Sequence, residues 1–422
     1  MNPSRNELQL YISKFRLELT NILTWWQDHA VEKSGDGFYG AADLEGNPVP
    51  EANKSCVLNA RILWTFSAAA KMLGNSAQQA MARRAFKVIS DKFADHEFGG
   101  YYMELTHDHH IANDIKHTYA QAFVLYALSK YYELEPSPDL MERIQSHFHL
   151  LEEKTRDQQH PGYMEAFTRD WKPLQENRMA DNNEPRSMNT HLHLLEAYAA
   201  LYNVWKDERV RRQLSGLLNL FLHKIIRDNG HLGIFFDKDF NETESSKGIC
   251  SFGHDIEGSW LLLEAAEILG DEEITEAIKR ISVKMAGVVE REGVDKDGGL
   301  FLESVRFGSH LRTNKHWWLQ AENLVGFMNA FELTGDLTYW EGVKLSWDFI
   351  ESHVIDHIRG EWYTKVNRLG VPFLEEPEDD PSPYYRNDWK IDPWKCPYHN
   401  GRAMMELVKR TERILTKQNF RL

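Results

Sequence analysis

One short stretch near the middle of the chain combines groups that can move protons. Residues 251–260 read Ser-Phe-Gly-His-Asp-Ile-Glu-Gly-Ser-Trp, and an apolar run follows them. If a helix starts here, His254 lies in its first turn and Glu257 follows three positions later, so both side chains share a face. An imidazole titrates near neutral pH, and a neighbouring carboxylate orients it or raises its basicity. The stretch is a candidate for acid–base catalysis, although a structural His–Glu pair at a helix start would have the same sequence.

Glycine–aromatic turns recur along the chain and indicate how such groups are positioned. They lie at 34–40, 98–104, 160–165, 229–235, 297–303 and 359–363, roughly 60 to 70 residues apart. Each interval has room for two helices, and apolar spacing predicts helices over 8–32, 55–73 and 76–93. Six helical hairpins without a Pro/Ser-rich linker predict an all-α fold, an (α/α)6 barrel that forms one domain over residues 1–422. A solenoid would need polar capping repeats, which the sequence lacks.

Composition excludes several classes of function. The 422 residues carry a formal net charge of −15, whereas binding to nucleic acid needs a basic surface. No apolar run approaches the length of a membrane span, and the first residues contain no secretory h-region. Three cysteines that lie far apart indicate neither a disulfide framework nor a zinc site. We therefore expect a soluble cytoplasmic protein without a nucleic-acid or membrane partner. We also expect a monomer, although none of these features bears on the oligomeric state.

Polar and aromatic residues recur at the expected starts of the inner helices, which line one mouth of such a barrel. Burying a polar group without a partner costs free energy. The recurrence of polar groups at the start of each inner helix therefore indicates that they bind a ligand. Asn189 and His193 are four apart and share a helix face, whereas His191 lies about 200° from His193; we expect His193 in the cavity. Any one of these histidines could still be structural. The residues are Asn59, Arg61 and Trp64; His117, Tyr119 and Gln121; Asn189, His191 and His193; His254 and Glu257; His316, Trp317, Trp318 and Glu322; and Trp394, Lys395, His399 and Arg402.

The sequence lacks several motifs that commonly indicate a cofactor, a metal or a nucleophilic serine. It lacks a His-Glu-x-x-His zinc motif, a glycine-rich phosphate loop and a Gly-x-Ser-x-Gly elbow. The run His107-Asp108-His109-His110 is interpreted as a solvated loop, because adjacent residues rarely converge on one ion. We therefore expect acid–base chemistry with no cofactor and no metal.

Four segments together resemble the N-acylglucosamine 2-epimerase superfamily. They are residues 187–198, 252–257, 317–322 and 394–399, which occur in the family's order and span all but the ends of the chain. The resemblance implies an (α/α)6 barrel, in agreement with the repeat. It also implies an enzyme that inverts C2 of the reducing-end glucose in cellobiose or lactose, giving a mannose-ended disaccharide.

The resemblance implies a mechanism and a role for each residue. After the sugar ring opens, one histidine removes the C2 proton to give a cis-enediolate, rotation about C2–C3 presents the other face, and a second histidine returns a proton. These two are His254, supported by Glu257, and His399. The other matched positions are Arg61, which faces the C1 and C2 oxygens; Tyr119, Asn189 and His193, which bind hydroxyl groups; Trp317 and Trp394, which hold the disaccharide; and Trp318 and Glu322, which are further substrate-binding positions. Which of the adjacent Trp317 and Trp318 stacks on the sugar stays open. The acidic, proline-containing segment 375–389 is expected to form a rim of the cavity.

Three alternatives stay open. A monosaccharide enzyme of the same superfamily, an N-acylglucosamine 2-epimerase or a mannose isomerase, would use the same two histidines. An (α/α)6 glycoside hydrolase or lyase would need two carboxylates that flank a glycosidic bond. A non-catalytic sugar-binding barrel would not need both His254 and His399.

Overall fold

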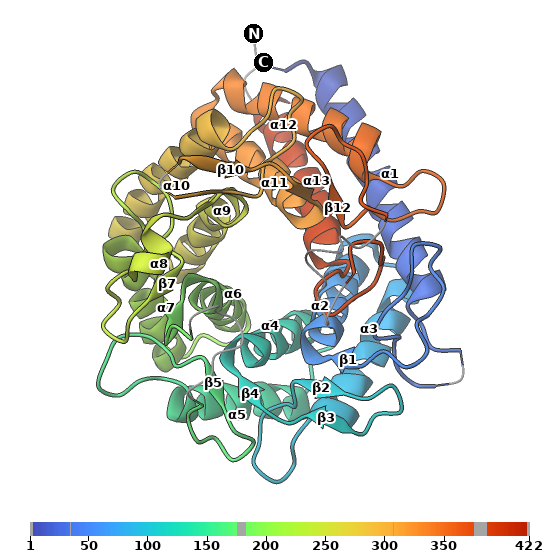
Figure 1. Cartoon of the computed structure of the whole chain (residues 1–422), viewed down its shortest axis with the longest axis vertical. Helices are drawn as coiled ribbons and strands as arrows, with labels where there is room; N and C mark the ends of the chain where they lie inside the picture. Colours follow the sequence, from blue (N-terminus) through green and yellow to red (C-terminus); the bar gives the residue numbers. More distant parts are fainter. Residues whose placement is uncertain (1–2, 34, 175–182, 307, 375–385, 420–422) are drawn as a thin grey trace.

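The computed structural model of the chain describes residues 3–33, 35–174, 183–306, 308–374 and 386–419. Within these residues, six inner helices surround a central axis and six outer helices surround them (Figure 1). Each inner helix contacts the next, and the last contacts the first, so the ring is closed. The chain is an (α/α)6 barrel, as the repeat predicts. The inner helices are α2 (Cys56–Leu73), α4 (Thr118–Leu134), α6 (Met188–Val204), α9 (Phe252–Leu269), α11 (Trp317–Thr334) and α13 (Tyr398–Asn419); the outer helices are α1 (Arg5–His29), α3 (Ser76–Val88), α5 (Pro138–Lys154), α7 (Glu208–Leu220), α10 (Glu272–Glu292) and α12 (Leu337–Phe349).

The two rings differ in the faces that they bury. The outer helix α7 is amphipathic, because its buried residues Val210, Leu214, Leu217 and Leu218 follow the spacing of one helix face. The inner helix α6 is enclosed on every side, with all of residues 190–201 buried. A helix enclosed in this way leaves no solvated face for a polar side chain. Polar residues on the inner ring therefore need a partner or a ligand.

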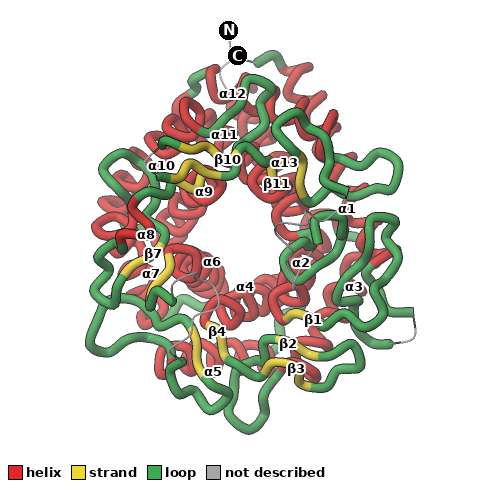
Figure 2. The backbone as a smooth tube through the Cα atoms, viewed as in Figure 1, coloured by secondary structure: helices red, strands yellow, loops and turns green. Residues whose placement is uncertain are grey.

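Short antiparallel strands precede the inner helices at the end of the barrel that faces the viewer in Figure 2. They form the sheets β1-β2-β3 and β10-β9-β8 and the pairs β4-β5, β6-β7 and β11-β12. Each predicted turn lies between an outer helix and the inner helix that follows it. The strands are β1 (Lys54–Ser55), β2 (Glu104–Leu105), β3 (Ile111–Asn113), β4 (Lys116–His117), β5 (Ala166–Phe167), β6 (Arg186–Ser187), β7 (Phe235–Phe236), β8 (Cys250–Ser251), β9 (Glu303–Val305), β10 (His310–Arg312), β11 (Lys315–His316) and β12 (Lys365–Val366).

Most helix bounds agree with the sequence to within a few residues. The exception is the predicted helix 76–93, which consists of α3 and a π-helical turn over Ile89–Phe93. Similar π turns, Phe221–Ile225 and Ile350–Val354, end α7 and α12. A one-turn helix, α8 (Glu244–Lys247), stands between β7 and β8. Hydrophobic spacing cannot separate an α turn from a π turn, because both continue the same apolar face.

A buried ion pair fixes the strand before several inner helices. A basic residue stands two positions before the helix in four units, as Lys54, Lys116, Arg186 and Lys315. The Lys116 Nζ atom lies 2.8 Å from Asp95 Oδ2, and both side chains are fully buried. Either charge alone would be costly in this position, so the pair holds the turn and the helix start together.

The fourth residue of four inner helices binds the backbone of the neighbouring turn. The Gln121 side chain accepts a hydrogen bond from the Tyr101 N–H at 3.0 Å and donates one to the Tyr101 carbonyl at 2.7 Å. In the next unit, His191 Nε2 accepts a hydrogen bond from the Tyr163 N–H at 2.9 Å. His191 therefore faces the turn and has a structural role. The four residues are Gln121, His191, Asp255 and Gln320.

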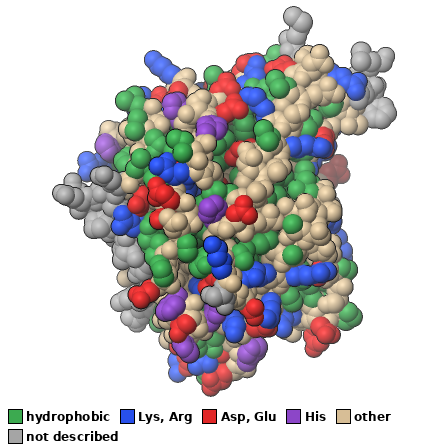
Figure 3. Space-filling model, turned by 90° about the vertical axis from the view of Figure 1, so that its right-hand side faces the viewer, with side chains coloured by type: hydrophobic (Ala, Val, Ile, Leu, Met, Phe, Trp, Pro, Cys, Tyr) green, Lys and Arg blue, Asp and Glu red, His purple; other side chains and the backbone are tan. Residues whose placement is uncertain are grey.

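The surface carries both signs of charge. On the face shown in Figure 3, Lys and Arg side chains are interspersed with Asp and Glu side chains. This face therefore lacks the continuous basic surface that nucleic-acid phosphates need. In the ranges that the structure describes, no helix combines the length and the apolar character that crossing a membrane requires.

The N-terminal helix α1 packs along α13 and joins the first unit to the sixth. The Glu18 side chain of α1 is 5% exposed and accepts hydrogen bonds from Trp362 Nε1 at 2.7 Å and Asn21 Nδ2 at 3.1 Å. Burial raises the pKa of Glu18 to about 7. The two hydrogen bonds offset only part of the cost of desolvating the carboxylate.

We expect Glu18→Gln to stabilise the protein at alkaline pH. Because the folded-state pKa lies above the ordinary value, the stability that Glu18 contributes is complete below about pH 4.5 and is lost as the pH rises through 7. Gln keeps an acceptor for Trp362 and carries no charge, so the free energy of unfolding should rise by about 2 kcal/mol at about pH 8. Denaturant unfolding at about pH 4 and about pH 8 measures the difference. An equal change at both pH values would contradict the assignment.

Candidate active site

Ten of the residues singled out in the sequence line one cavity at the strand end of the barrel axis. The cavity has a volume of about 270 Å³. Glu322, which the resemblance also assigns to the site, lies behind the lining residue His399. The lining residues are Arg61, Tyr119, Asn189, His193, His254, Glu257, Trp317, Trp318, Trp394 and His399.

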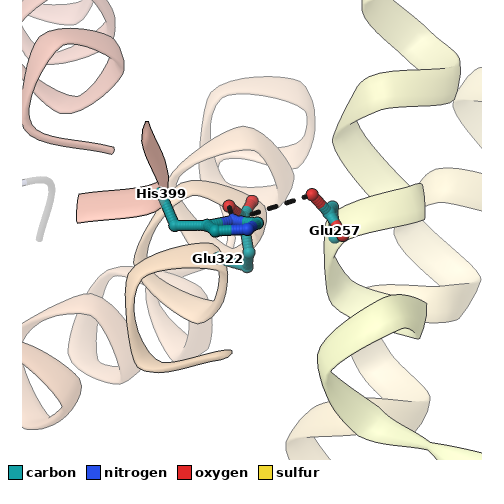
Figure 4. Close-up of side chains that lie close together, drawn as sticks. All are labelled: Glu257, Glu322 and His399. Carbon is teal, nitrogen blue, oxygen red and sulfur yellow. Dashed lines mark hydrogen bonds and ion pairs between the residues drawn. The ribbon is translucent and has the colours of Figure 1, made fainter. Parts of the chain in front are cut away.

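His399 is held by a carboxylate from a neighbouring inner helix. Its Nδ1 lies 2.7 Å from Glu322 Oε1 and 3.9 Å from Glu257 Oε1. Figure 4 shows the three side chains close together. Burial, together with the guanidinium of Arg61, lowers the pKa of His399 well below 6.5, so the imidazole is neutral. Because Nδ1 is engaged, Nε2 is the atom that can exchange a proton in the cavity.

His254 is held by a hydroxyl group. It is the third residue of α9, and its Nδ1 lies 2.8 Å from Ser251 Oγ. Burial lowers the pKa of His254 to about 4. The ring centroid of Trp318 lies 4.9 Å from that of His254 and 5.6 Å from that of His399. Two neutral imidazoles from different helices thus contact the same indole.

The predicted pairing of His254 with Glu257 is wrong. Glu257 accepts a hydrogen bond from Arg402 Nη2 at 2.9 Å, and the hydrogen bond that the structure gives His254 is to Ser251. A spacing of three brings two side chains to one helix face but does not decide which partner each one binds. The Arg402 guanidinium carries a full charge, which makes it a stronger partner for a carboxylate than a neutral imidazole is.

One buried guanidinium connects the carboxylates around the cavity. Arg402 is 2% exposed, and its Nη2 donates to Glu257 at 2.9 Å and to Glu322 at 2.7 Å. Its Nη1 donates to Glu196, whose Oε2 lies 3.0 Å from His193 Nδ1. Burial and the neighbouring Glu322 raise the pKa of Glu257 to about 8. Burial alone would also raise the pKa of Glu196. The neighbouring Arg402 and His193 have the larger combined effect and lower it to about 2.

Glu257, Glu322 and His399 each present an atom that could bind a metal ion, and these atoms lie within 4.8 Å of one another. Both carboxylates are bonded to Arg402, so a side chain already supplies the positive charge that an ion would bring. The loop 107–110 is largely exposed, and its His109 Nε2 lies 2.8 Å from Lys54 Nζ. The groups at the cavity are suited to proton transfer beside fixed positive charge.

Aromatic neighbours position Arg61. Its guanidinium carbon lies 4.3 Å from the ring centroid of Phe123, and Nη2 donates to Tyr119 Oη at 2.8 Å. Its Nη1 donates to the Trp394 carbonyl at 3.4 Å. A guanidinium that is held at the wall of a cavity stabilises negative charge that develops on a ligand there.

The two tryptophans that begin α11 differ in how much surface they offer. Trp317 is 4% exposed, with its ring centroid 5.3 Å from that of His399, whereas Trp318 is only partly buried. Trp318 therefore has more free surface for a ligand. Asn189 also lines the cavity, and its Oδ1 has no hydrogen-bond partner within the described residues. Residues 375–385 of the expected rim lie outside the described ranges.

Two charged residues of the site received no role from the sequence. Glu196 follows His193 by three positions, and Arg402 follows His399 by three positions. Because residues three apart share a helix face, this spacing could have indicated that both carboxylate and guanidinium point toward the same region as the histidines. What the spacing could not give is their contact with each other across the barrel.

Comparison with known proteins identifies the family. The sequence pattern of the N-acylglucosamine 2-epimerase (GlcNAc 2-epimerase) family matches residues 37–385. A Bacteroides fragilis protein named cellobiose 2-epimerase is 39% identical over 392 residues, which are 92% of this chain and 96% of that protein. The structure of cellobiose 2-epimerase from Bacillus thermoamylovorans B4167 has a TM-score of 0.88 at 32% identity and covers 95% of this chain and 100% of its own. A solved D-mannose isomerase shares the fold, with a TM-score of 0.79 at 19% identity over 94% of this chain and 97% of its own. The chain belongs to the N-acylglucosamine 2-epimerase family, a family of carbohydrate 2-epimerases.

Proposed function

We propose that this protein inverts C2 of the reducing-end glucose of β-1,4-linked disaccharides, converting cellobiose into glucosyl-mannose and lactose into epilactose. The pair His254 and His399 carries the proposal, because two neutral imidazoles from different inner helices line the same cavity. Inversion at a carbon next to a carbonyl needs a base on each face of a planar intermediate. The similarity to proteins named cellobiose 2-epimerase over more than nine tenths of the chain supports a disaccharide substrate.

The proposed reaction moves one proton off C2 and another onto it. After ring opening, the Nε2 of one histidine takes the C2 proton, and the electron pair of the broken C–H bond forms the C1–C2 double bond of a cis-enediolate. The negative charge that develops on the oxygens is stabilised by Arg61. Rotation about C2–C3 turns the other face of C2 toward the second histidine. That histidine, as the imidazolium, delivers its Nε2 proton to C2. The electron pair of the C1–C2 double bond forms the new C–H bond, the charge on O1 re-forms the C1 carbonyl, and the histidine is left as a neutral imidazole.

The carboxylates have positioning roles in this proposal. Glu322 holds the ring of His399 through Nδ1, and Arg402 holds Glu322 in turn. Glu257 accepts a hydrogen bond from the same Arg402 nitrogen, Nη2. A glycoside hydrolase would need one of its two carboxyl groups free to protonate the glycosidic oxygen. The second carboxyl group must face the substrate as well. Glu257 lines the cavity, whereas Glu322 lies behind His399 and is bonded to it, so the site is better suited to epimerisation than to hydrolysis.

Replacing either histidine should abolish epimerisation while the fold is kept. We expect His254→Asn and His399→Asn each to lower kcat by about 10²- to 10⁴-fold, the usual effect of losing a general base. Product formation from cellobiose and the circular dichroism spectrum measure activity and folding. His149→Asn is a matched control, because His149 is exposed on the outer helix α5, and it should retain activity. Turnover near the wild-type rate by His399→Asn would refute the assignment.

The substrate class depends on the aromatic residues of the mouth. A second sugar ring that stacks on Trp394 would gain about 1–3 kcal/mol, and this remote contact can also orient the reacting end. We therefore expect kcat/KM for cellobiose or lactose to exceed that for glucose or mannose by at least about tenfold, with Trp394→Ala narrowing the ratio. Trp205→Ala, at the far end of α6, should leave the ratio unchanged. Equal or faster turnover of mannose or N-acetylglucosamine would favour a monosaccharide enzyme instead.

A further inference from the structure

Ser251 stands where a serine usually caps a helix, but its hydroxyl is used differently. Ser55 and Ser187, at the matching positions before α2 and α6, accept hydrogen bonds from the backbone N–H three residues later, at 3.4 and 3.2 Å. Ser251 makes no side-chain capping bond within the described residues, and its Oγ lies 2.8 Å from His254 Nδ1. Since an N-cap hydroxyl ordinarily satisfies a free N–H of the first turn, α9 gives up this contact in favour of the histidine.

The two histidines of the cavity therefore have unlike partners. A carboxylate, that of Glu322, faces Nδ1 of His399, and a hydroxyl faces Nδ1 of His254. An ionised carboxylate only accepts a hydrogen bond, whereas a hydroxyl can accept or donate one. When Ser251 Oγ accepts from Nδ1–H, the Nε2 of His254 carries a lone pair; when Oγ–H donates to Nδ1, Nε2 carries the hydrogen. A neutral His254 can thus adopt either tautomer, and the tautomer with the lone pair on Nε2 is the one that can take a proton from C2.

We propose that Ser251 is a positioning residue for His254: its hydroxyl holds the imidazole ring and determines which ring nitrogen carries the hydrogen. This inference rests on the proposed function, because it assumes that His254 exchanges a proton with C2. Ser251 is 7% exposed, so water does not readily replace its hydroxyl. Each histidine serves one face of C2, and therefore one of the two epimers. Removing the partner of one histidine should consequently affect the exchange of one epimer only.

Deuterium exchange at C2 without inversion tests the inference for each histidine separately. In D₂O, a histidine that removes the C2 proton of its own epimer can return a deuteron to the same face. NMR follows this exchange separately for cellobiose and for glucosyl-mannose. We expect Ser251→Ala to slow the exchange of one epimer by about tenfold or more, with KM within about twofold of wild type. Glu322→Gln should slow the exchange of the other epimer, and Ser251→Thr, which keeps the hydroxyl, should restore the rate.

Matched variants separate positioning from a loss of stability. Ser55→Ala removes a capping serine at the same helix position and should lower Tm while both exchange rates stay at the wild-type level. If Ser251→Ala does not fold, Ser251→Cys gives the same comparison with a weaker hydrogen-bonding group. Equal slowing of both epimers, slowing of the same epimer by the Ser251 and Glu322 variants, or no effect of Ser251→Ala would overturn the inference. If the wild-type enzyme exchanged C2 of neither epimer, the proposed function itself would fail and this inference with it.

Discussion

A single guanidinium buried among three carboxylates is the interaction on which the rest of the site depends. Arg402 binds Glu196, Glu257 and Glu322, and it lies 4.7 Å from the ring centroid of Trp260, whose Nε1 donates to Glu322 at 3.0 Å. Loss of one partner of a buried ion pair commonly costs about 3–5 kcal/mol, because a charge is left without compensation. Two of these carboxylates in turn fix the rings of His193 and His399. Their orientation is therefore a property of the whole cluster and not of the helix on which each stands.

The barrel repeats one backbone arrangement and varies the side chains that it presents. The fourth residue of an inner helix commonly binds its turn, and the sixth faces the site. The sixth residue is an arginine, a phenylalanine, a histidine and two glutamates in five successive units: Arg61, Phe123, His193, Glu257 and Glu322. Similar positions thus supply a cation, an apolar support, an imidazole and carboxylates. The contact of the fourth residue with its turn recurs in four of the repeats. The chemistry of the site depends on the side chains that differ between repeats at the sixth position.

The sequence predicts the barrel and the cavity better than it predicts the contacts inside the cavity. Turn spacing and apolar periodicity are local features, and they suffice to place six helix starts at one mouth. Helical spacing also separates His193 from His191 correctly, since both lie on one helix. The partner of Glu257, by contrast, is Arg402, which lies 145 residues away. Such a contact exists only once the ring has closed, and no local pattern specifies it. The roles of the individual residues came from the resemblance to the family.

The different partners of His254 and His399 also could not be predicted from local sequence patterns. The sequence shows His254 and His399 at two helix starts, but it does not show that one meets a hydroxyl and the other a carboxylate. Ser251 has the sequence of an ordinary N-cap, and only its contact with Nδ1 reveals another use. In a repeat with a regular backbone and irregular side-chain partners, the contacts show the use of each residue and the sequence does not.

The central claim is that C2 is inverted by proton transfer between carbon and protein bases. Incubation of the wild-type protein with cellobiose in D₂O, followed by NMR of the products, tests it most directly. The account predicts a mannose-ended disaccharide that carries deuterium at C2, with the glycosidic bond intact, because the returned hydron comes from a histidine that exchanges with solvent. A mannose-ended product that retains protium at C2, or release of free glucose without inversion, would contradict it.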